Sequence, residues 1–169
     1  MLQGNALREQ IIIPEQRMFY DYWRTKCNDS LLPSRHDISP EDIKDFLPTV
    51  SLIELCQSSD MPRFRFRLAG TAFWDYFNDE ITGQYVDELP LGSRCKYWDR
   101  ILHKICHTKR PTVGVTRPGT PNGSHLAQFW VRLPLSDDGV NVNMILGFDH
   151  FVKLSAIVEE NPHKAAIYA

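Results

Sequence analysis

The stretch that decides the fold runs from Arg63 to Gly83 and reads RFRFRLAGTAFWDYFNDEITG. In its first part, arginines alternate with Phe64, Phe66 and Leu68. Successive side chains of a strand point to opposite faces of a sheet, so this alternation predicts a strand with one buried and one solvated face. Because parallel sheets are covered on both faces, a half-buried strand favours an antiparallel sheet.

The second part of the stretch changes from a strand to a short aromatic helix. Gly70 gives the backbone freedom to turn, and a helix is predicted over residues 72–77. This helix carries Phe73 and Trp74. The chain is therefore expected to pass from a sheet with one wet face into a helical cover over the dry face.

Longer helices are predicted on either side of this stretch. Residues 14–26 begin with a proline and repeat aromatic side chains at helical spacing. Residues 93–109 place their apolar side chains on one side of a helical wheel. A capping signal at Ser39 and Pro40 also predicts a short helix over residues 40–46.

Four further segments have strand character, which brings the predicted total to five. They are residues 49–55, 112–117, 126–135 and 140–148. The element order predicts an α+β protein with a five-stranded antiparallel sheet, helices on one face and an N-terminal helix. We expect an N-terminal helical extension over residues 1–27, one domain over 28–154 and a tail over 155–169.

Composition narrows the class of protein. The chain has 169 residues, of which 43% are hydrophobic and 24% charged, as in a globular domain. Its net charge of -2 gives no electrostatic reason to expect nucleic acid as a partner. The four cysteines occur singly, and no apolar run has the length of a membrane span or a signal peptide. We therefore expect a cytoplasmic protein with free thiols and no membrane partner.

Several short motifs in this order resemble those of PAS domains, in particular a group of small stand-alone bacterial PAS-like proteins. They are Leu32-Pro33 with Arg35, DISP at 37–40, LPTV at 47–50, FRFRLAGT at 64–71 and ITG at 81–83. The resemblance covers about residues 22–151. It implies a five-stranded antiparallel sheet wrapped by helices on one face, with a small-molecule pocket between them.

The same resemblance implies a function in bacterial signal transduction. PAS domains sense ligands or mediate protein contacts, so this chain is expected to be a sensor or interaction module and not an enzyme. Because it carries no recognisable output domain, its signal is expected to depend on a separate partner, such as a histidine kinase. A ligand-binding enzyme of unknown reaction is the competing class, although no residue set supports a reaction.

An aromatic set is the candidate lining of the ligand pocket. Its members are Phe66, Trp74, Phe77, Trp98 and Phe129. Such residues line ligand cavities but also fill closed cores, and the sequence does not separate the two. Arg67 joins the set, because an arginine at a strand end can clamp a carboxylate or pair with Glu54 or Asp75. No cofactor is identified.

Two histidines offer an alternative chemistry. His103 and His107 stand four residues apart on the predicted helix over 93–109, and some haem-binding PAS domains take an axial histidine from this helix. The helical wheel places both far from the apolar arc, so we expect them to face solvent. A haem or metal sensor remains the alternative. Cys106 lies at the edge of the apolar arc and is expected to be a buried structural thiol.

A candidate interface combines the sheet with the N-terminal helix. Trp130 and Ile145 interrupt a polar pattern, which includes Gln128 and Arg132, on the face of the sheet that we expect to point outward. The helix over 14–26 offers a matching stripe, from the same chain or from a second subunit. The stripe consists of Met18, Phe19, Tyr22 and Trp23. We therefore expect this helix to cover the sheet or to build a homodimer.

Overall fold

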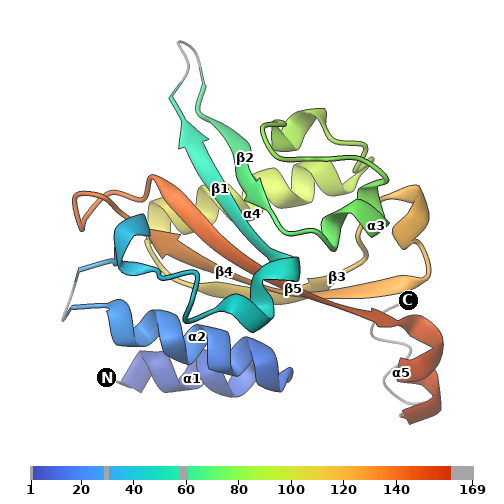
Figure 1. The fold of residues 1–169 in the computed structure, drawn as a ribbon, viewed down its shortest axis with the longest axis horizontal. Helices are drawn as coiled ribbons and strands as arrows, with labels where there is room; N and C mark the ends of the chain where they lie inside the picture. Colours follow the sequence, from blue (N-terminus) through green and yellow to red (C-terminus); the bar gives the residue numbers. More distant parts are fainter. Residues whose placement is uncertain (1, 29–30, 58–60, 161–169) are drawn as a thin grey trace.

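A five-stranded antiparallel sheet forms the centre of the computed structural model, which describes residues 2–28, 31–57 and 61–160. The strand order is β2-β1-β5-β4-β3, and every neighbouring pair is antiparallel (Figure 1). The strands are β1 (Val50–Cys56), β2 (Arg63–Ala69), β3 (Thr112–Thr116), β4 (Leu126–Leu135) and β5 (Met144–Lys153). The α+β class and the antiparallel sheet predicted from the sequence are confirmed.

Helices accompany the sheet at both ends of the chain and between β2 and β3. They are α1 (Leu2–Gln10), α2 (Pro14–Lys26), α3 (Phe73–Phe77), α4 (Arg94–Thr108) and α5 (Leu154–Glu160). The predicted helices over 14–26, 72–77 and 93–109 are confirmed to within one residue. The sequence did not predict α1 or α5. In the described part of the chain, no helix combines the length and the apolar character that crossing a bilayer requires.

Two predicted boundaries are wrong, each for a local reason. Residues 40–46 form a turn followed by the 3-10 helix η2 (Lys44–Thr49), because Phe46 N–H donates to the Ile43 carbonyl three residues back. The strand predicted over residues 140–148 instead runs from Met144 to Lys153. The Asp138 carboxylate accepts hydrogen bonds from the backbone N–H groups of residues 140 and 141, which removes both from strand pairing.

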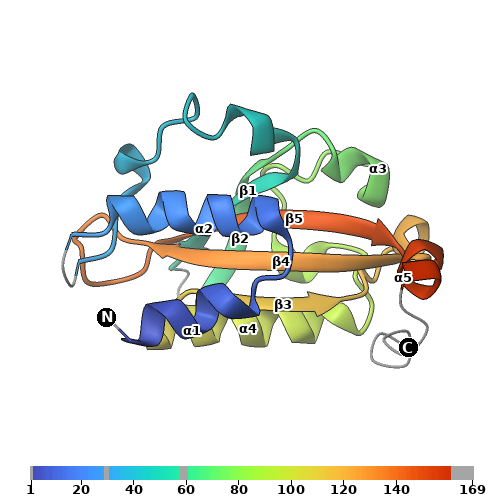
Figure 2. The ribbon, with the colours of Figure 1, turned by 90° about the horizontal axis from the view of Figure 1, so that it is seen from below.

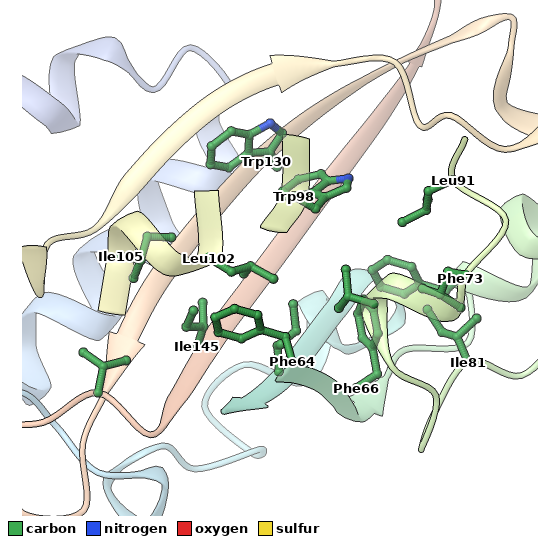
Figure 3. Packing of buried hydrophobic residues seen from close by; sticks show 14 residues of the cluster. Phe64, Phe66, Phe73, Ile81, Leu91, Trp98, Leu102, Ile105, Trp130 and Ile145 are labelled. Carbon is green, nitrogen blue, oxygen red and sulfur yellow. The ribbon is translucent and has the colours of Figure 1, made fainter. Parts of the chain in front are cut away.

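The two faces of the sheet are covered by different helices (Figure 2). On one face, Phe19 and Trp23 of α2 pack with Val131, Leu133 and Phe148. On the other face, α4 contributes the side chains that Figure 3 shows packed above the strands. These are Trp98, Leu102 and Ile105, and they meet Phe64, Phe66, Trp130 and Ile145. The N-terminal helix thus covers the sheet within one chain.

The side chains of β4 and β5 point to the opposite faces of the sheet from those expected. Both strands alternate as predicted, but Trp130 and Ile145 are 1% exposed and lie in the core beneath α4, not on an outward face. Residues 131 and 133, which alternate with Trp130 along β4, point to the opposite face and pack beneath α2. The reason is that Gln128 and Arg132 are polar but buried on the α4 face. Polar residues at every second position of this strand therefore do not identify its solvent-exposed face.

Candidate functional site

A cavity lies between the sheet, α3 and α4. Its volume is about 30 Å³, and most of its wall is apolar. The lining residues are Ile53, Phe66, Phe73, Tyr76, Phe77, Val86, Leu89, Leu91, Trp98, Leu102, Pro118, Gln128, Arg132 and Phe151. Three of the predicted ligand-binding residues, Phe66, Phe77 and Trp98, are therefore brought together at this cavity.

One end of the cavity is polar and belongs to the central strands. Arg132 of β4 donates through Nη2 to Asp149 Oδ1 of β5 at 3.0 Å, and Gln128 donates through Nε2 to the same oxygen at 2.7 Å. The side chains of Arg132 and Asp149 are only 3% and 0% exposed. Burying two charges is costly even when they are paired, so this cluster is not explained by stability alone.

The polar cluster leaves part of its hydrogen-bonding capacity unused. Among the described residues, Arg132 Nε, Asp149 Oδ2 and Ser51 Oγ are buried without a hydrogen-bond partner. Gly147 provides the space for this cluster, because a Cβ at that position would collide with Ser51 Oγ and lie 3.0 Å from Arg132 Nη1. Buried polar atoms are nearly always paired, so three unpaired atoms in one cluster are unusual and set this part of the sheet apart from an ordinary apolar core.

Aromatic rings hold the arginine in place. The Arg132 guanidinium lies 4.7 Å from the centre of the Trp98 ring, a distance at which cation–π attraction operates. Trp98 in turn meets Trp130 edge to face, with ring centres 5.2 Å apart. The contacts of Trp98 therefore connect α4 with the polar end of the cavity.

The other predicted ligand-binding residues lie elsewhere. Trp74 is 53% exposed on the outer side of α3, and Arg67 is exposed on β2. Glu54, one of the two acids proposed as partners of Arg67, pairs with Arg65 instead. Phe129 lines a separate cleft of about 270 Å³ on the α2 face, next to Ile11 and Gln16. The structure does not bring these residues to the cavity.

The histidines of α4 stand apart from the cavity. His103 Nδ1 lies 2.9 Å from the carbonyl of Asp99, and its ring meets Phe64 edge to face. The His103 side chain is 40% exposed, and His107 is also exposed. Within residues 2–28, 31–57 and 61–160, no group of three or more His, Cys, Asp or Glu side chains is arranged to hold a metal ion.

The thiol of Cys106 is half-buried on the same helix. Burial raises its pKa to about 11, because the thiolate form is poorly solvated there. At neutral pH the side chain is therefore protonated, and a protonated thiol is a weak nucleophile.

The predicted interface stripe of α2 divides into two parts. Phe19 and Trp23 are buried against the sheet, Tyr22 is partly buried, and Met18 is 61% exposed. The sequence analysis missed Gln16, which is buried and donates through Nε2 to the Phe129 carbonyl at 2.9 Å and the Phe148 carbonyl at 3.4 Å. This side chain anchors α2 to β4 and β5.

Sequence reasoning also missed the polar cluster itself. Gln128 and Arg132 were assigned to a solvated face, and Asp149 was not singled out. A signal was present, because an arginine in an otherwise apolar strand and an acid in the paired strand are a pattern that suggests a buried ion pair.

Comparison with known proteins adds a family and a fold. A sequence model described as a PAS domain matches residues 12–149. A search of curated proteins finds no match. Among solved structures, the Vibrio cholerae VqmA dimer without target DNA is 15% identical, with a TM-score of 0.51 over 70% of this chain and 53% of that chain. A Rhodobacter sphaeroides LOV protein is 14% identical, with a TM-score of 0.50 over 73% of each chain.

A third structure, a sensory box sensor histidine kinase from Vibrio cholerae, is 15% identical, with a TM-score of 0.46 over 67% of this chain and 86% of that chain. The present chain spans 53% to 58% of the VqmA chains that it resembles. At such identities the likeness to solved structures concerns the fold alone.

Proposed function

The chain belongs to the PAS domain family, and from this membership we propose that it is a sensory module of bacterial signal transduction that detects a small molecule bound between the sheet and helices α3 and α4. PAS domains typically serve as sensory modules in signalling. The observation that supports a ligand is the cavity whose apolar wall ends at Gln128 and Arg132, beside buried polar atoms that have no partner among the described residues.

The polar end of the cavity favours a ligand-binding site over a closed hydrophobic core. An ion pair buried as deeply as Arg132–Asp149 can often be replaced by apolar residues of similar volume without loss of stability. Ligand pockets, in contrast, combine apolar walls with a small number of polar groups that orient the ligand. The lining of this cavity has that composition, with Phe66, Phe77 and Trp98 supplying apolar surface.

The signal is proposed to reach a separate protein, such as a histidine kinase, in the cytoplasm. Exposed apolar side chains near the N-terminus offer a contact surface, because Ile12 is 54% exposed and Met18 is 61% exposed. We propose that the same region supports a homodimer. Single exposed apolar residues are common, so the assignment depends on the closeness of the two in sequence, with Ile12 just before α2 and Met18 in its second turn.

Native mass spectrometry of the freshly purified full chain tests the ligand. A retained small molecule, released on denaturation, is the expected result, and a variant that fills the cavity, Leu102→Trp, should lose it. Trp74→Ala is the matched control, because this exposed side chain does not line the cavity. Protein that purifies without a bound molecule and binds none from a cell extract would contradict the proposal.

An absorption spectrum of the same sample tests the alternative. A Soret band that is lost in a His103→Ala or His107→Ala variant would replace the proposal with a haem sensor. A pull-down from the source cell with the wild-type chain and with Met18→Glu tests the partner. We expect a signalling protein to be captured by the wild type and lost with the charged variant.

A further inference from the structure

We propose that the cavity binds an uncharged, single-ring, planar molecule in which a hydrogen-bond donor stands next to an acceptor, as in a cyclic amide. This inference rests on the proposed ligand-sensing function and adds the chemistry of the ligand. It follows from the charge, the hydrogen-bonding groups and the shape of the cavity.

The charge balance of the polar end favours a neutral ligand. Arg132 is the single charged residue among the described residues that line the cavity, and its guanidinium already pairs with Asp149 at 3.0 Å. An anion would therefore meet no unpaired cation and would lie close to the Asp149 carboxylate. A cation would be repelled by Arg132. Because a buried charge without a partner is strongly unfavourable, a neutral molecule fits best.

The unused hydrogen-bonding groups define the edge of the ligand. Gln128 donates to Asp149, which leaves its carbonyl oxygen without a donor from any described residue. Arg132 lines the cavity and uses two of the five N–H groups of its guanidinium on described residues, one on the Val131 carbonyl and one on Asp149 Oδ1, so donors remain for a ligand. The two side chains converge, since both donate to Asp149 Oδ1, at 2.7 and 3.0 Å. One edge of a small ring, with a donor for Gln128 and an acceptor for Arg132, would satisfy both.

The walls favour a flat ring. Phe66 and Trp98 approach from β2 and α4, and Phe73, Phe77 and Phe151 complete an aromatic lining. Aromatic rings pack with one another in offset or edge-to-face arrangements that stabilise beyond the area they bury. A planar heterocycle uses these faces better than a branched aliphatic molecule of the same size.

The size of the cavity implies that α3 shifts when the ligand binds. At about 30 Å³ the cavity has room for about two water molecules, whereas an engineered cavity of roughly 150 Å³ accepts benzene. Phe73, Tyr76 and Phe77 all belong to α3, a helix of five residues, while the polar end belongs to the paired strands β4 and β5. Enlargement on the α3 side leaves the polar end in place.

Isothermal titration of the full-length protein with three probes of similar size tests the assignment. The probes are 2-pyridone, which carries the donor–acceptor edge, toluene, which lacks polar groups, and benzoate, which is an anion. Two net hydrogen bonds predict a dissociation constant about tenfold lower for 2-pyridone than for toluene. Gln128→Leu should remove this preference, and Trp74→Ala should retain it.

The outcomes separate this inference from the proposed function. If benzoate binds most tightly, or toluene binds as well as 2-pyridone, the ligand class is wrong while the ligand site stands. If no probe binds but native mass spectrometry finds a retained molecule without a donor–acceptor edge, the class is again wrong. If no probe binds, no molecule is retained, and a crystal structure shows only water at Arg132, both proposals fail. Because the wild-type titrations decide these cases, the result does not depend on the folding of a variant.

Discussion

At the scale of single residues, the Arg132–Asp149 pair links binding chemistry to stability. Arg132→Met alone would leave the Asp149 carboxylate, which is 0% exposed, without a cationic partner. We expect this change to lower the free energy of unfolding by about 3–5 kcal/mol, measured by urea denaturation. The double variant Arg132→Met with Asp149→Asn removes both charges and keeps an acceptor for Gln128.

The double variant should recover at least half of the stability lost in the single one, because the cost arises from the unpaired charge and not from the missing bond. Equal loss in the single and double variants would show that the pair is a net stabilising interaction. In that case, stability alone would explain why the pair is buried, and the pair would no longer support a ligand site.

Gly147 is the residue that makes room for the polar cluster. Gly147→Ala brings a Cβ into collision with Ser51 Oγ, which lies on the neighbouring strand in direct register. We expect a loss of about 1–3 kcal/mol from overpacking, visible as a lower midpoint of thermal unfolding. Adding Ser51→Gly should restore most of it. A fully stable Gly147→Ala protein would mean that the cluster is looser than the structure shows.

At the scale of elements, Gln16 decides how α2 sits on the sheet. Its amide donates to carbonyls of β4 and β5 from a fully covered position. Gln16→Leu keeps the volume but removes the two hydrogen bonds that tie α2 to β4 and β5, so we expect a loss of about 1–3 kcal/mol. Hydrogen exchange of α2 amides should accelerate. Met18→Ala, at an exposed site of the same helix, is the control and should change neither quantity.

The loop between β4 and β5 gives a pH-dependent prediction. Hydrogen bonds from Asn141 N–H, Ser136 Oγ and Val140 N–H hold the pKa of Asp138 well below its usual value of 3.8. The Asp138 carboxylate is therefore protonated less readily in the folded state than in the unfolded state. The resulting stability is present above about pH 4 and is lost as the pH falls towards the lowered pKa.

Thermal unfolding midpoints between pH 6 and pH 2 measure this effect. The wild type should lose stability on acidification more steeply than Asp138→Asn, because asparagine does not titrate. Parallel curves for the two proteins would show that the Asp138 loop does not contribute to acid sensitivity.

The elements also show what sequence can and cannot predict. Alternation over residues 63–66 of β2 and helical spacing along α2 and α4 were sufficient, since each reflects a local rule of side-chain direction. Leu68, expected on the buried face, is 39% exposed, because the pairing of β1 with β2 shifts register before it. The phase of β4 and β5 required tertiary information. Arg132 resembles a solvated residue until its partner is known, and that partner is 17 residues away on the next strand. Consequently, Trp130 and Ile145 were assigned to the wrong face, and half of the predicted ligand-binding set lies outside the cavity.

At the scale of the whole molecule, the N-terminal helices complete the core. Deleting residues 1–27 removes Phe19 and Trp23 and uncovers Val131, Leu133 and Phe148 of the sheet. Each buried aromatic side chain contributes about 1.5–3 kcal/mol, so we expect a loss of at least about 3 kcal/mol. The uncovered face should also cause self-association, which light scattering would detect.

Deleting only residues 1–10 is the matched control for that truncation. It removes α1, with the partly buried Leu7 and the exposed Arg8–Asp21 pair, but leaves α2 and its buried aromatic side chains in place. Exposed ion pairs contribute less than about 1 kcal/mol and Leu7 is only partly buried, so stability should change much less than in the longer truncation. If the longer truncation had unchanged stability and unchanged oligomeric state, then α2 would neither protect the sheet nor build a dimer.

The anchor of α2 has a consequence for how a bound molecule could be reported to a partner. Gln16 holds the carbonyls of Phe129 and Phe148, and these residues adjoin Gln128 and Asp149 along the chain. A ligand that changes the hydrogen bonds of Gln128 or Asp149 on one face of the sheet would therefore shift the neighbouring carbonyls, to which the Gln16 amide donates on the opposite face. The conformational change would reach the N-terminal helices directly through the single layer of the sheet, and no loop would be needed to transmit it.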